Sequence, residues 1–586
     1  MVHLLKNLDL NAVLESTMSA VLNFFRKKVQ WVPETADQKA VIRELYKLHE
    51  HTTGIGAVEE DNEIEKNYNA LAEHEENATS EGFEGDIEKQ SLGSVSKESV
   101  IPSNEPYDYN KWSQIVNMDG KEVIYIKFAD NDKENPYNWS SARKALCVFI
   151  MMFLTFIGGV AGASLSSGTS DMAERLDTPI EVSRLGFAIF ILGFAIGPLV
   201  TSPLAEDYGR WPCYMVGIFG ILIFSVPAGA AHHIAVVIIF RFIGGFVGSV
   251  ASSMISGTIA DIYYPINRGY PMLWHTAINF LGNVGAPVCF GYVGWLMSFR
   301  WIMWILIMAC GLTMLLMFLF MEETRGQVIL QTRANRLQKK YGGPNKVFLV
   351  HGKVYIPFSR MIARSLHRPI LFLLTEPVVG WFSLWMGFTW GTIYICFGAV
   401  PTVMQAQYGF NPGEASLVFN AEIVGVIIGC FLDIWQQKLY QKNKEKRGPE
   451  ARLYMSCAGG ICCFDGIFIF GAAQGRGHWI GPCIGLAILL VGVVSIFQAI
   501  SLYFADCYGT YASSALAAQS LLRNIFGFVS PLYTSYMFES RLGFTGASCL
   551  AAGVCTLLAI VPFWLLIFGK RLRKNSKYIV SDEELT

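Results

Sequence analysis

Residues 203–212 read PLAEDYGRWP, and this short charged stretch separates two apolar segments, 184–203 and 212–231. Each flanking segment has ~20 residues, enough for a helix to cross a hydrocarbon core ~30 Å thick. Helices are expected because lipid offers no partner for an unpaired backbone N–H or C=O group. This part of the sequence therefore predicts a hairpin of two membrane-spanning helices joined by a charged turn.

Similar apolar segments recur on both sides of this hairpin. We place twelve of them, at 145–167, 184–203, 212–231, 235–260, 270–296, 301–321, 370–399, 414–435, 452–472, 479–504, 511–537 and 546–568. The longest hydrophilic stretch between them divides the set into six and six. We expect an all-α polytopic membrane protein with two six-helix halves at 143–321 and 370–568, a central loop at 322–369 and a C-terminal tail at 569–586.

The first 142 residues differ from the rest in composition. They begin with a pattern that suggests an amphipathic helix and then turn acidic, since the stretch from Glu59 to Glu105 carries many more acidic than basic residues. Such a segment has too little apolar surface to offset the entropy cost of ordering. Residues 1–142 are predicted to be a largely disordered, acidic tail.

Composition also narrows the class of protein. Of the 586 residues, 52% are hydrophobic and 16% are charged, against roughly 25% charged in an average soluble chain. The formal net charge of −1 provides no basic field that would attract nucleic acid. The 13 cysteines include no CxxC pair, and no nucleotide-binding, metalloprotease or hydrolase motif is found. We expect no enzyme activity, no cofactor and no bound metal.

The orientation follows from the loops, because short cytoplasmic loops carry an excess of Lys and Arg. Basic residues cluster before the first span, between spans six and seven, between spans eight and nine, and after the last span. The loops on the other side carry few. Both termini are therefore predicted to be cytoplasmic.

The charged turn after the second span holds Glu206, Asp207, Gly209 and Arg210. A carboxylate followed by a Gly-Arg turn allows a charge-assisted lock between helix ends that forms in one conformation and breaks in another. An ordinary capped loop with an arginine that sets the topology explains the same residues equally well.

The same stretch resembles the loop between spans two and three of the major facilitator superfamily, in its fungal drug:proton antiporter branch with twelve spans. Further boxes of that branch follow in order along residues 135–578. They are NPYNWS at 135–140, RFIGG at 241–245, TIAD at 258–261 with Arg268, the ET-led helix from 323, RP and EP at 368–369 and 376–377, PEARL at 449–453, and Tyr503, Asp506 and Tyr508.

This resemblance implies the major facilitator fold and a function. It implies proton-coupled export of drugs, toxins or polyamines by a monomer in the plasma membrane, with a vacuolar membrane as the other possibility. The partners would be protons, a small organic substrate and lipid. Asp261 and Arg268 would belong to the conformational gate with the charged turn, and Arg241 would take part in proton coupling.

The fifth span departs from the branch pattern. Gly282, Pro287 and Gly291 match it, but Ala286 and Phe290 stand where glycines are expected. Because small residues let helices approach closely, Phe290 should push this span from its neighbour or fill a pocket. Proton-coupled uptake of a nutrient such as a vitamin or base therefore remains an alternative, and a transport-incompetent sensor is a second one.

Charged residues inside the spans are the next candidates, since one at the membrane centre costs about 2.5 to 3.5 kcal/mol on the insertion scale. Arg241, Glu422, Asp465 and Arg523 are such residues. We assign proton coupling to Arg241 and Glu422, because burial should raise the pKa of a carboxyl and a nearby arginine should shift it. Structural pairing is the alternative for each.

A central cavity would be lined by polar and aromatic residues from several spans if the superfamily fold holds. The candidates are His275, Asn279, Trp381, Tyr394, Asn420, Gln498, Tyr503 and Arg523. For any one of them, a role in packing or at the membrane interface is the commoner explanation.

Overall fold

The computed structural model describes residues 113–118, 121–129, 131–264, 267–342, 346–350, 358–574 and 576. The predicted disorder of residues 1–112 lies outside the described residues. The chain forms two compact units, one of residues 1–139 with 323–360 and one of residues 140–322 with 361–586. The second unit is a helical bundle.

The N-terminal half of the bundle contains the helices that correspond to the first six predicted spans. They are α6 (Ser141–Ala163), η2 (Ser164–Gly168), α7 (Thr169–Arg175), α8 (Ile180–Tyr208), α9 (Arg210–Gly229), α10 (Ile234–Gly248), α11 (Val250–Ser253), α12 (Ile255–Ile262), α13 (Gly269–Leu296) and α14 (Phe299–Phe320). The fourth span is thus divided into three consecutive helices, α10 to α12. The first span runs through α6 into η2, and the second, third, fifth and sixth spans are single helices.

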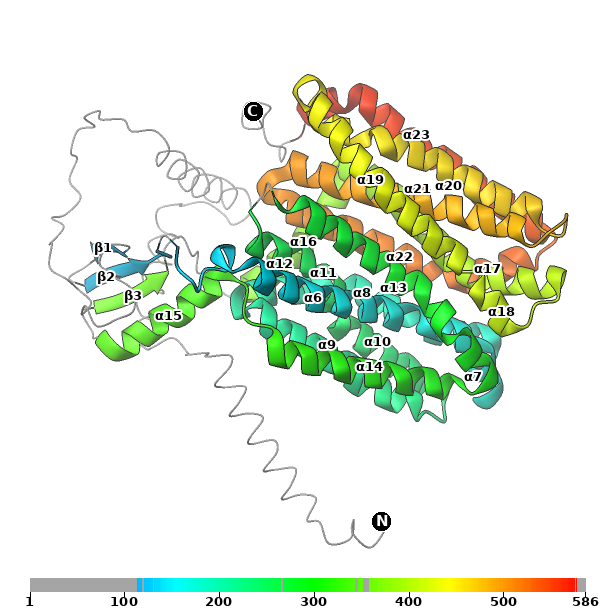
Figure 1. Cartoon of the computed structure of the whole chain (residues 1–586), viewed down its shortest axis with the longest axis horizontal. Coiled ribbons are helices and arrows are strands. Elements are labelled where there is room, and N and C mark those ends of the chain that lie inside the picture. Colours follow the sequence, from blue (N-terminus) through cyan, green and yellow to red (C-terminus); the bar gives the residue numbers. More distant parts are fainter. Residues whose placement is uncertain are drawn as a thin grey trace, which may run out of the picture. The chain divides into compact units, whose positions relative to one another are not determined.

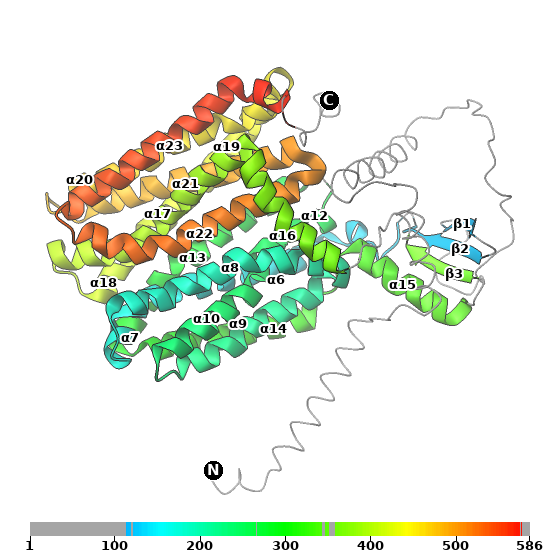
Figure 2. The ribbon, with the colours of Figure 1, turned by 180° about the vertical axis from the view of Figure 1, so that it is seen from behind.

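The C-terminal half provides the remaining six spans, and Figures 1 and 2 show the helices of each half lying together. Its helices are α16 (Phe358–Thr375), α17 (Pro377–Tyr408), α18 (Pro412–Leu417), α19 (Asn420–Arg447), η4 (Gly448–Leu453), α20 (Tyr454–Ala473), α21 (Ile480–Tyr508), η5 (Gly509–Tyr511), α22 (Ala512–Phe538) and α23 (Gly543–Lys574). The predicted architecture of twelve spans in two halves is confirmed.

Two predicted boundaries in the C-terminal half are wrong. The seventh span was expected from residue 370, but α17 begins at Pro377 after the separate helix α16. Proline at the first helical position starts a helix well, because its missing N–H has no partner there in any case. The eighth span was expected at 414–435, but the structure divides this region into α18 and the longer α19.

Nine helical segments in the described part of the chain are long and apolar enough to cross a membrane by length and composition alone. Helices α13 and α22 are not among them, although both occupy predicted spans. They carry amide and charged side chains, such as Asn283 on α13 and Arg523 on α22. These polar groups lie inside the bundle, while residues such as Trp295 on α13 and Tyr536 on α22 are exposed.

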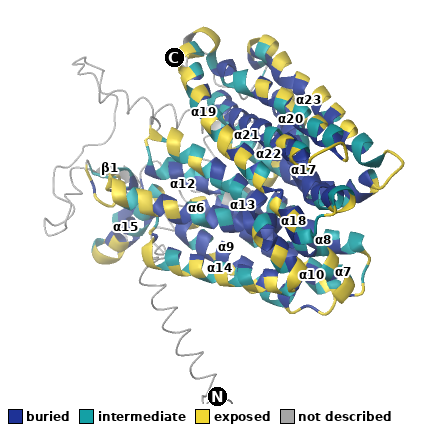
Figure 3. Ribbon diagram, turned by 45° about the vertical axis from the view of Figure 1, so that its right-hand side comes forward, coloured by how far each residue is buried: buried dark blue, intermediate teal, exposed yellow. Residues whose placement is uncertain are grey.

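The outer helices present apolar side chains to lipid. On α14 and α23, only 33% of the most apolar window is buried, against 83% on α17. Exposed residues such as Leu315 and Phe320 on α14 and Ile567 on α23 form these faces. Figure 3 shows buried residues concentrated on the inner helices, with exposed residues along α14 and α23. Helix α17 therefore belongs to the interior of the bundle.

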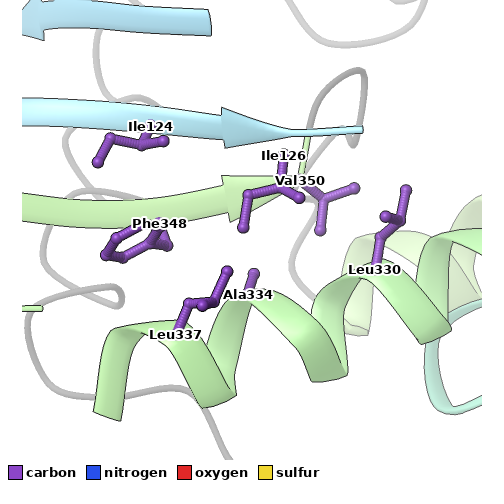
Figure 4. Packing of buried hydrophobic residues seen from close by; sticks show 7 residues of the cluster. All are labelled: Ile124, Ile126, Leu330, Ala334, Leu337, Phe348 and Val350. Carbon is purple, nitrogen blue, oxygen red and sulfur yellow. The ribbon is translucent and has the colours of Figure 1, made fainter. Parts of the chain in front are cut away.

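The first unit contains a small sheet covered by a helix. Strands β1 (Ser113–Met118) and β2 (Lys121–Ile126) form an antiparallel hairpin, and β3 (Lys346–Val350) pairs in parallel with β2. Helix α15 (Gly326–Tyr341) packs on it. The core, drawn in Figure 4, consists of Ile124, Ile126, Leu330, Ala334, Leu337, Phe348 and Val350.

This sheet lies within segments expected to have no strands. Residues 113–126 belong to the tail predicted to be largely disordered, and residues 346–350 belong to the predicted central loop. The tail therefore has an ordered part. Each strand is short, and β2 and β3 are joined only by pairing between segments far apart in sequence.

Arg333 on α15 fastens the end of this tail segment. Its guanidinium forms ion pairs with Asp132 at 2.7 Å and Glu134 at 2.6 Å. The Asp132 side chain is fully buried. Because a buried carboxylate without a partner is costly, Arg333 is needed to hold residues 132–134 in place.

Candidate functional site

A cluster of aromatic rings surrounds Arg523 near the middle of α22. Its guanidinium carbon lies 4.8 Å from the ring centroid of Trp390 on α17 and 5.2 Å from that of Phe497 on α21. Only 9% of Arg523 is exposed. A cation over an aromatic face is attracted by the negative face of the ring, more strongly when both are desolvated.

The N-terminal half contributes α13 to the same cluster. The ring of Phe280 lies edge-on to Trp390 at 5.2 Å and to Phe497 at 5.5 Å. Asn524, next to Arg523, donates a hydrogen bond to the backbone oxygen of Phe194 on α8 at 3.5 Å. The cluster is therefore built by both halves, where a rocking motion would change its shape.

Two polar pairs across the halves lie among these helices. The Tyr394 hydroxyl on α17 donates to Asn283 Oδ1 on α13 at 3.1 Å. The Thr276 hydroxyl on α13 donates to Gln498 Oε1 on α21 at 2.9 Å. Hydrogen bonds of this kind hold the halves in one arrangement and are exchangeable for bonds to a ligand. We call the set Arg523, Trp390, Phe497, Phe280, Tyr394, Asn283, Thr276 and Gln498 the central site.

Arg241 lies on α10, inside the N-terminal half. Its Nη1 donates to the backbone oxygen of Ala161 at 2.8 Å, and its guanidinium covers the ring of Phe190 at 4.3 Å. Its Nε and Nη2 have no hydrogen-bond partner among the described residues. No described carboxylate forms an ion pair with it, so it does not lie beside the carboxyl that the sequence led us to pair with it.

Glu422 lies on α19, inside the C-terminal half, with no exposed surface. Its carboxyl group lies against the thiol of Cys396 on α17. Neither carboxyl oxygen has a hydrogen bond of ordinary geometry to any described residue. Cys396 also lines a small apolar cavity of this half, together with Phe470 and Leu489. A charged carboxylate is poorly stabilised in such surroundings, so the neutral form is favoured.

A second buried carboxyl lies three turns further along α19, and the sequence analysis missed it. Asp433 is 2% exposed, and its Oδ2 has no partner among the described residues. It stands in the last part of the predicted span, where polar and apolar residues are mixed. The sequence therefore gave no reason to expect it to be buried, unlike the lysines that follow. Only its burial in the structure distinguishes it.

The charged turn between α8 and α9 forms an ion pair with the end of the fourth span. Arg210 Nε lies 3.1 Å from Asp261 Oδ2, and the Arg210 side chain is 7% exposed. Gly257 leaves room for it, since a Cβ there would lie 2.7 Å from an Arg210 nitrogen. Gly209 has a φ of 105°, a conformation that favours glycine. The glycine and arginine of this turn therefore have separate, defined roles.

The two carboxylates of this turn, Glu206 and Asp207, are exposed, and the charge of Glu206 acts on Arg210. Arg268 donates to the backbone oxygens of Tyr263 at 2.8 Å and Ala260 at 2.9 Å, so it caps the end of α12. The structure thus brings together Arg210 and Asp261 from the predicted gate.

An equivalent pair occupies the same place in the C-terminal half. Arg452 Nε lies 2.9 Å from Asp506 Oδ2, joining the start of the ninth span to the end of the tenth. Arg573 binds both carboxylate oxygens of Glu450 at 2.8 and 3.0 Å. The structure therefore repeats one lock in both halves. We call the end of the bundle that holds these locks the basic end.

The sequence model of the family described as Major Facilitator Superfamily matches residues 146–531. The chain belongs to the major facilitator superfamily. An MFS-type efflux pump of Trichophyton rubrum is 32% identical over 460 residues, covering 77% of this chain and 77% of that protein. A major facilitator superfamily multidrug transporter of Aspergillus fumigatus is 32% identical over 472 residues, covering 79% and 77%. The chain is thus similar to fungal efflux transporters and is not an enzyme.

Solved structures of the superfamily share the fold. A partially occluded, inward-open xylose transporter XylE from E. coli matches with a TM-score of 0.53 at 14% identity, covering 73% of this chain and 98% of that one. A peptide transporter POT matches with the same TM-score at 12% identity, covering 73% and 95%. At such low identity the likeness concerns the fold alone.

Several predicted cavity residues of this superfamily member lie elsewhere. Trp381 is 49% exposed, and Asn420 is exposed with its amide donating to the backbone oxygen of Leu417. Tyr503 is buried at the basic end against Phe382. Asn279 is half-buried, and its backbone oxygen accepts from Asn283. Tyr394, Gln498 and Arg523 are the predicted residues that belong to the central site.

Trp390, Phe497, Phe280 and Asn283 were not predicted for the central site. Trp390 lies four residues before Tyr394, so the helical repeat places both on one face. Asn283 is a polar residue within the span-five motif. Both signals were present in the sequence, whereas the places of Phe280 and Phe497 depend on how the helices are rotated.

The span-five motif holds α13 against its neighbours. A Cβ at Gly282 would lie 2.6 Å from the backbone oxygen of Phe156 on α6, and a Cβ at Gly291 would lie 2.2 Å from Ser416 Cβ on α18. Pro287 lies inside the continuous helix, and Phe290 is buried. Close approach is therefore retained at both glycines, and Phe290 fills space inside the bundle.

Proposed function

We propose that this superfamily member is a proton-coupled exporter of hydrophobic or amphipathic small organic molecules that works by alternating access. The observation that carries the proposal is the central site, which takes its aromatic and polar residues from both halves. A solute bound there would favour one arrangement of the halves over another through its differential contacts. Export is preferred because the relatives include an efflux pump and a multidrug transporter.

Proton coupling is assigned to Glu422. A carboxyl without a cationic partner in the described part of the bundle is expected to be protonated at rest, and access from the other side would let it release the proton. One proton moving down ~1 pH unit supplies ~1.4 kcal/mol, and each 100 mV adds ~2.3 kcal/mol. Together they are enough for a solute gradient of roughly several hundredfold.

The two equivalent ion pairs are proposed to be the conformational locks. Arg210 with Asp261 and Arg452 with Asp506 join neighbouring helix ends within each half. Each pair is expected to hold its helix ends together in one conformation and to break in the other. The basic end would face the cytoplasm of a plasma membrane, with both termini inside and the protein as a monomer.

Nutrient uptake by the same fold is a second candidate, favoured by Phe290 in place of a glycine of the antiporter pattern. In the structure Gly282 keeps its close contact with α6, so this departure does not loosen the fifth span. We therefore rank export first.

The test uses purified protein in sealed liposomes with an imposed pH gradient and a panel of radiolabelled aromatic solutes. Export coupled to protons predicts that at least one solute moves against its gradient as protons move in the opposite direction. Movement of solute and protons in the same direction would indicate uptake. If no solute and no protons move, the proposed function is wrong.

A further inference from the structure

The central site contains a buried cation without an anionic partner. No carboxylate among the described residues forms an ion pair with Arg523. Its Nη2 donates to Ser520 Oγ on its own helix at 3.2 Å, and its buried Nε has no acceptor in the described part of the chain. Buried charges in membrane proteins are normally paired or mark a substrate pathway. The attraction of the guanidinium to the faces of Trp390 and Phe497 offsets only part of the free energy lost when Arg523 is removed from water.

Other hydrogen-bond donors near Arg523 also lack acceptors. Trp390, whose ring lies under the guanidinium, has a buried Nε1 that interacts with the Tyr394 hydroxyl but forms no hydrogen bond of ordinary geometry with any described residue. Gln519, one turn earlier on the same face of α22, is 2% exposed, and its Nε2 has no partner either. His275 on α13 also lies close to Arg523, and its buried Nδ1 has no partner among the described residues. The site thus has more unused donors than acceptors, together with one positive charge.

From this excess we infer that the central site binds a carboxylate through Arg523, so that its preferred substrates are monoanionic aromatic acids. A guanidinium binds a carboxylate through two parallel hydrogen bonds. The rings of Trp390, Phe497 and Phe280 provide surfaces against which an aromatic ring of the substrate packs. The inference rests on the proposed function for the site's role, and it narrows the substrate class.

A polyamine fits this site poorly. A polyamine carries several positive charges and only donors, while the site offers a positive charge and unused donors. Like charges brought together in a desolvated site repel each other, which works against binding. The aromatic acids are therefore favoured over the polyamines among the substrates that the family resemblance implies.

The test measures binding by isothermal titration calorimetry to the full-length protein in lipid nanodiscs at pH 7.5. The probes are 2-naphthoate, 2-naphthamide and 2-naphthylmethylamine, which share one ring system and carry a negative, zero and positive charge. We expect wild type to bind naphthoate at least roughly tenfold more tightly than either other probe. Arg523→Gln should remove this preference, and Arg523→Lys should keep part of it.

The matched control is Arg541→Gln, which removes an exposed arginine outside the site and should keep the wild-type preference. Thermal unfolding of each variant shows whether it is folded. If Arg523→Gln does not fold, the comparison of Arg523→Lys with wild type decides the test. Equal affinity for the three probes, tighter binding of the amine, no measurable binding of naphthoate, or an unchanged preference in the Arg523 variants would overturn the inference.

Binding of the probes does not depend on proton coupling or on the direction of transport. Naphthoate binding that requires Arg523, in a protein that moves no protons, would support the inference and contradict the proposed function. Proton-coupled transport by a protein that binds the three probes equally would support the proposed function and contradict the inference.

Discussion

Glu422 is fully buried in α19, with its carboxyl group against the Cys396 thiol. Glu422→Gln keeps the shape of the neutral acid but has no proton to release. We expect it to bind solute normally and to lose pH-driven accumulation by roughly tenfold per imposed pH unit, the amount that ~1.4 kcal/mol per proton sustains. Solute flux in liposomes measures this. Glu539→Gln, at an exposed position, is the control, and full accumulation by Glu422→Gln would exclude Glu422 as the proton carrier.

We predict that Glu376, at the basic end, makes the stability of the folded protein depend on pH. Burial raises the pKa of its carboxyl above the ordinary 4.5, although hydrogen bonds from Ser576 and Tyr508 partly oppose this. Because the folded protein holds the proton more tightly than the unfolded chain, Glu376 contributes most stability below pH 4.5 and loses it as the pH rises through the raised pKa.

Glu376→Gln should remove this dependence. Thermal unfolding of wild type and variant between pH 4.5 and 8 gives the difference in stability, which should move in favour of the variant as the pH rises. A difference that is constant with pH, or that moves in favour of wild type, would contradict the assigned cause.

Residue types at the site were easier to predict than the direction in which each side chain points. Arg523 and Tyr394 were predicted because charge and ring hydroxyls are rare inside spans. Trp381 and Asn420 lie outside the central site, and their assignment to the cavity stays a prediction, since a span that is apolar all round gives no sign of its rotation. Asp433 was missed because it stands in the last part of its predicted span, before the lysines that follow.

At the scale of elements, α13 and α6 approach closely at two glycines, Gly282 on α13 and Gly159 on α6. A Cβ at Gly282 would lie 2.6 Å from the backbone oxygen of Phe156, whereas a Cβ at Gly285 would have nothing within 4 Å. Gly282→Ala should destabilise the protein by about 1–3 kcal/mol through overpacking. Gly285→Ala is the matched control and should be neutral or stabilising by up to about 1 kcal/mol, from helix propensity. Equal unfolding free energies for the two variants would contradict this account of the fifth span.

The apolar segments predicted the spans, but not all the elements. Pro377 and the Asn411-Pro412 cap explain where α17 and α18 begin, and both signals were readable in the sequence. The sheet was not, because β2 pairs with β3 more than 200 residues later and a local pattern contains no information on such pairing.

At the scale of the whole molecule, the two halves pack closely at the end opposite the basic end. Figure 1 shows α7 and α18 at that end, and Gly291 of α13 meets Ser416 of α18 there. The basic loops and the family boxes predicted the two halves and their order. They did not predict that α13 and α18 would meet at this end, because one sequence serves every state of a transporter.

Alternating access about the central site is most directly tested by spin-label distances across both ends. Exposed positions are labelled in pairs, Tyr264→Cys with Lys442→Cys at the basic end and Glu174→Cys with Arg541→Cys at the opposite end. The exposed native cysteines Cys289 and Cys549 are replaced by serine. With a solute that drives proton flux, we predict that the distance at the basic end shortens while that at the opposite end lengthens. Distances that stay unchanged, or that change in the same direction at both ends, would contradict the account.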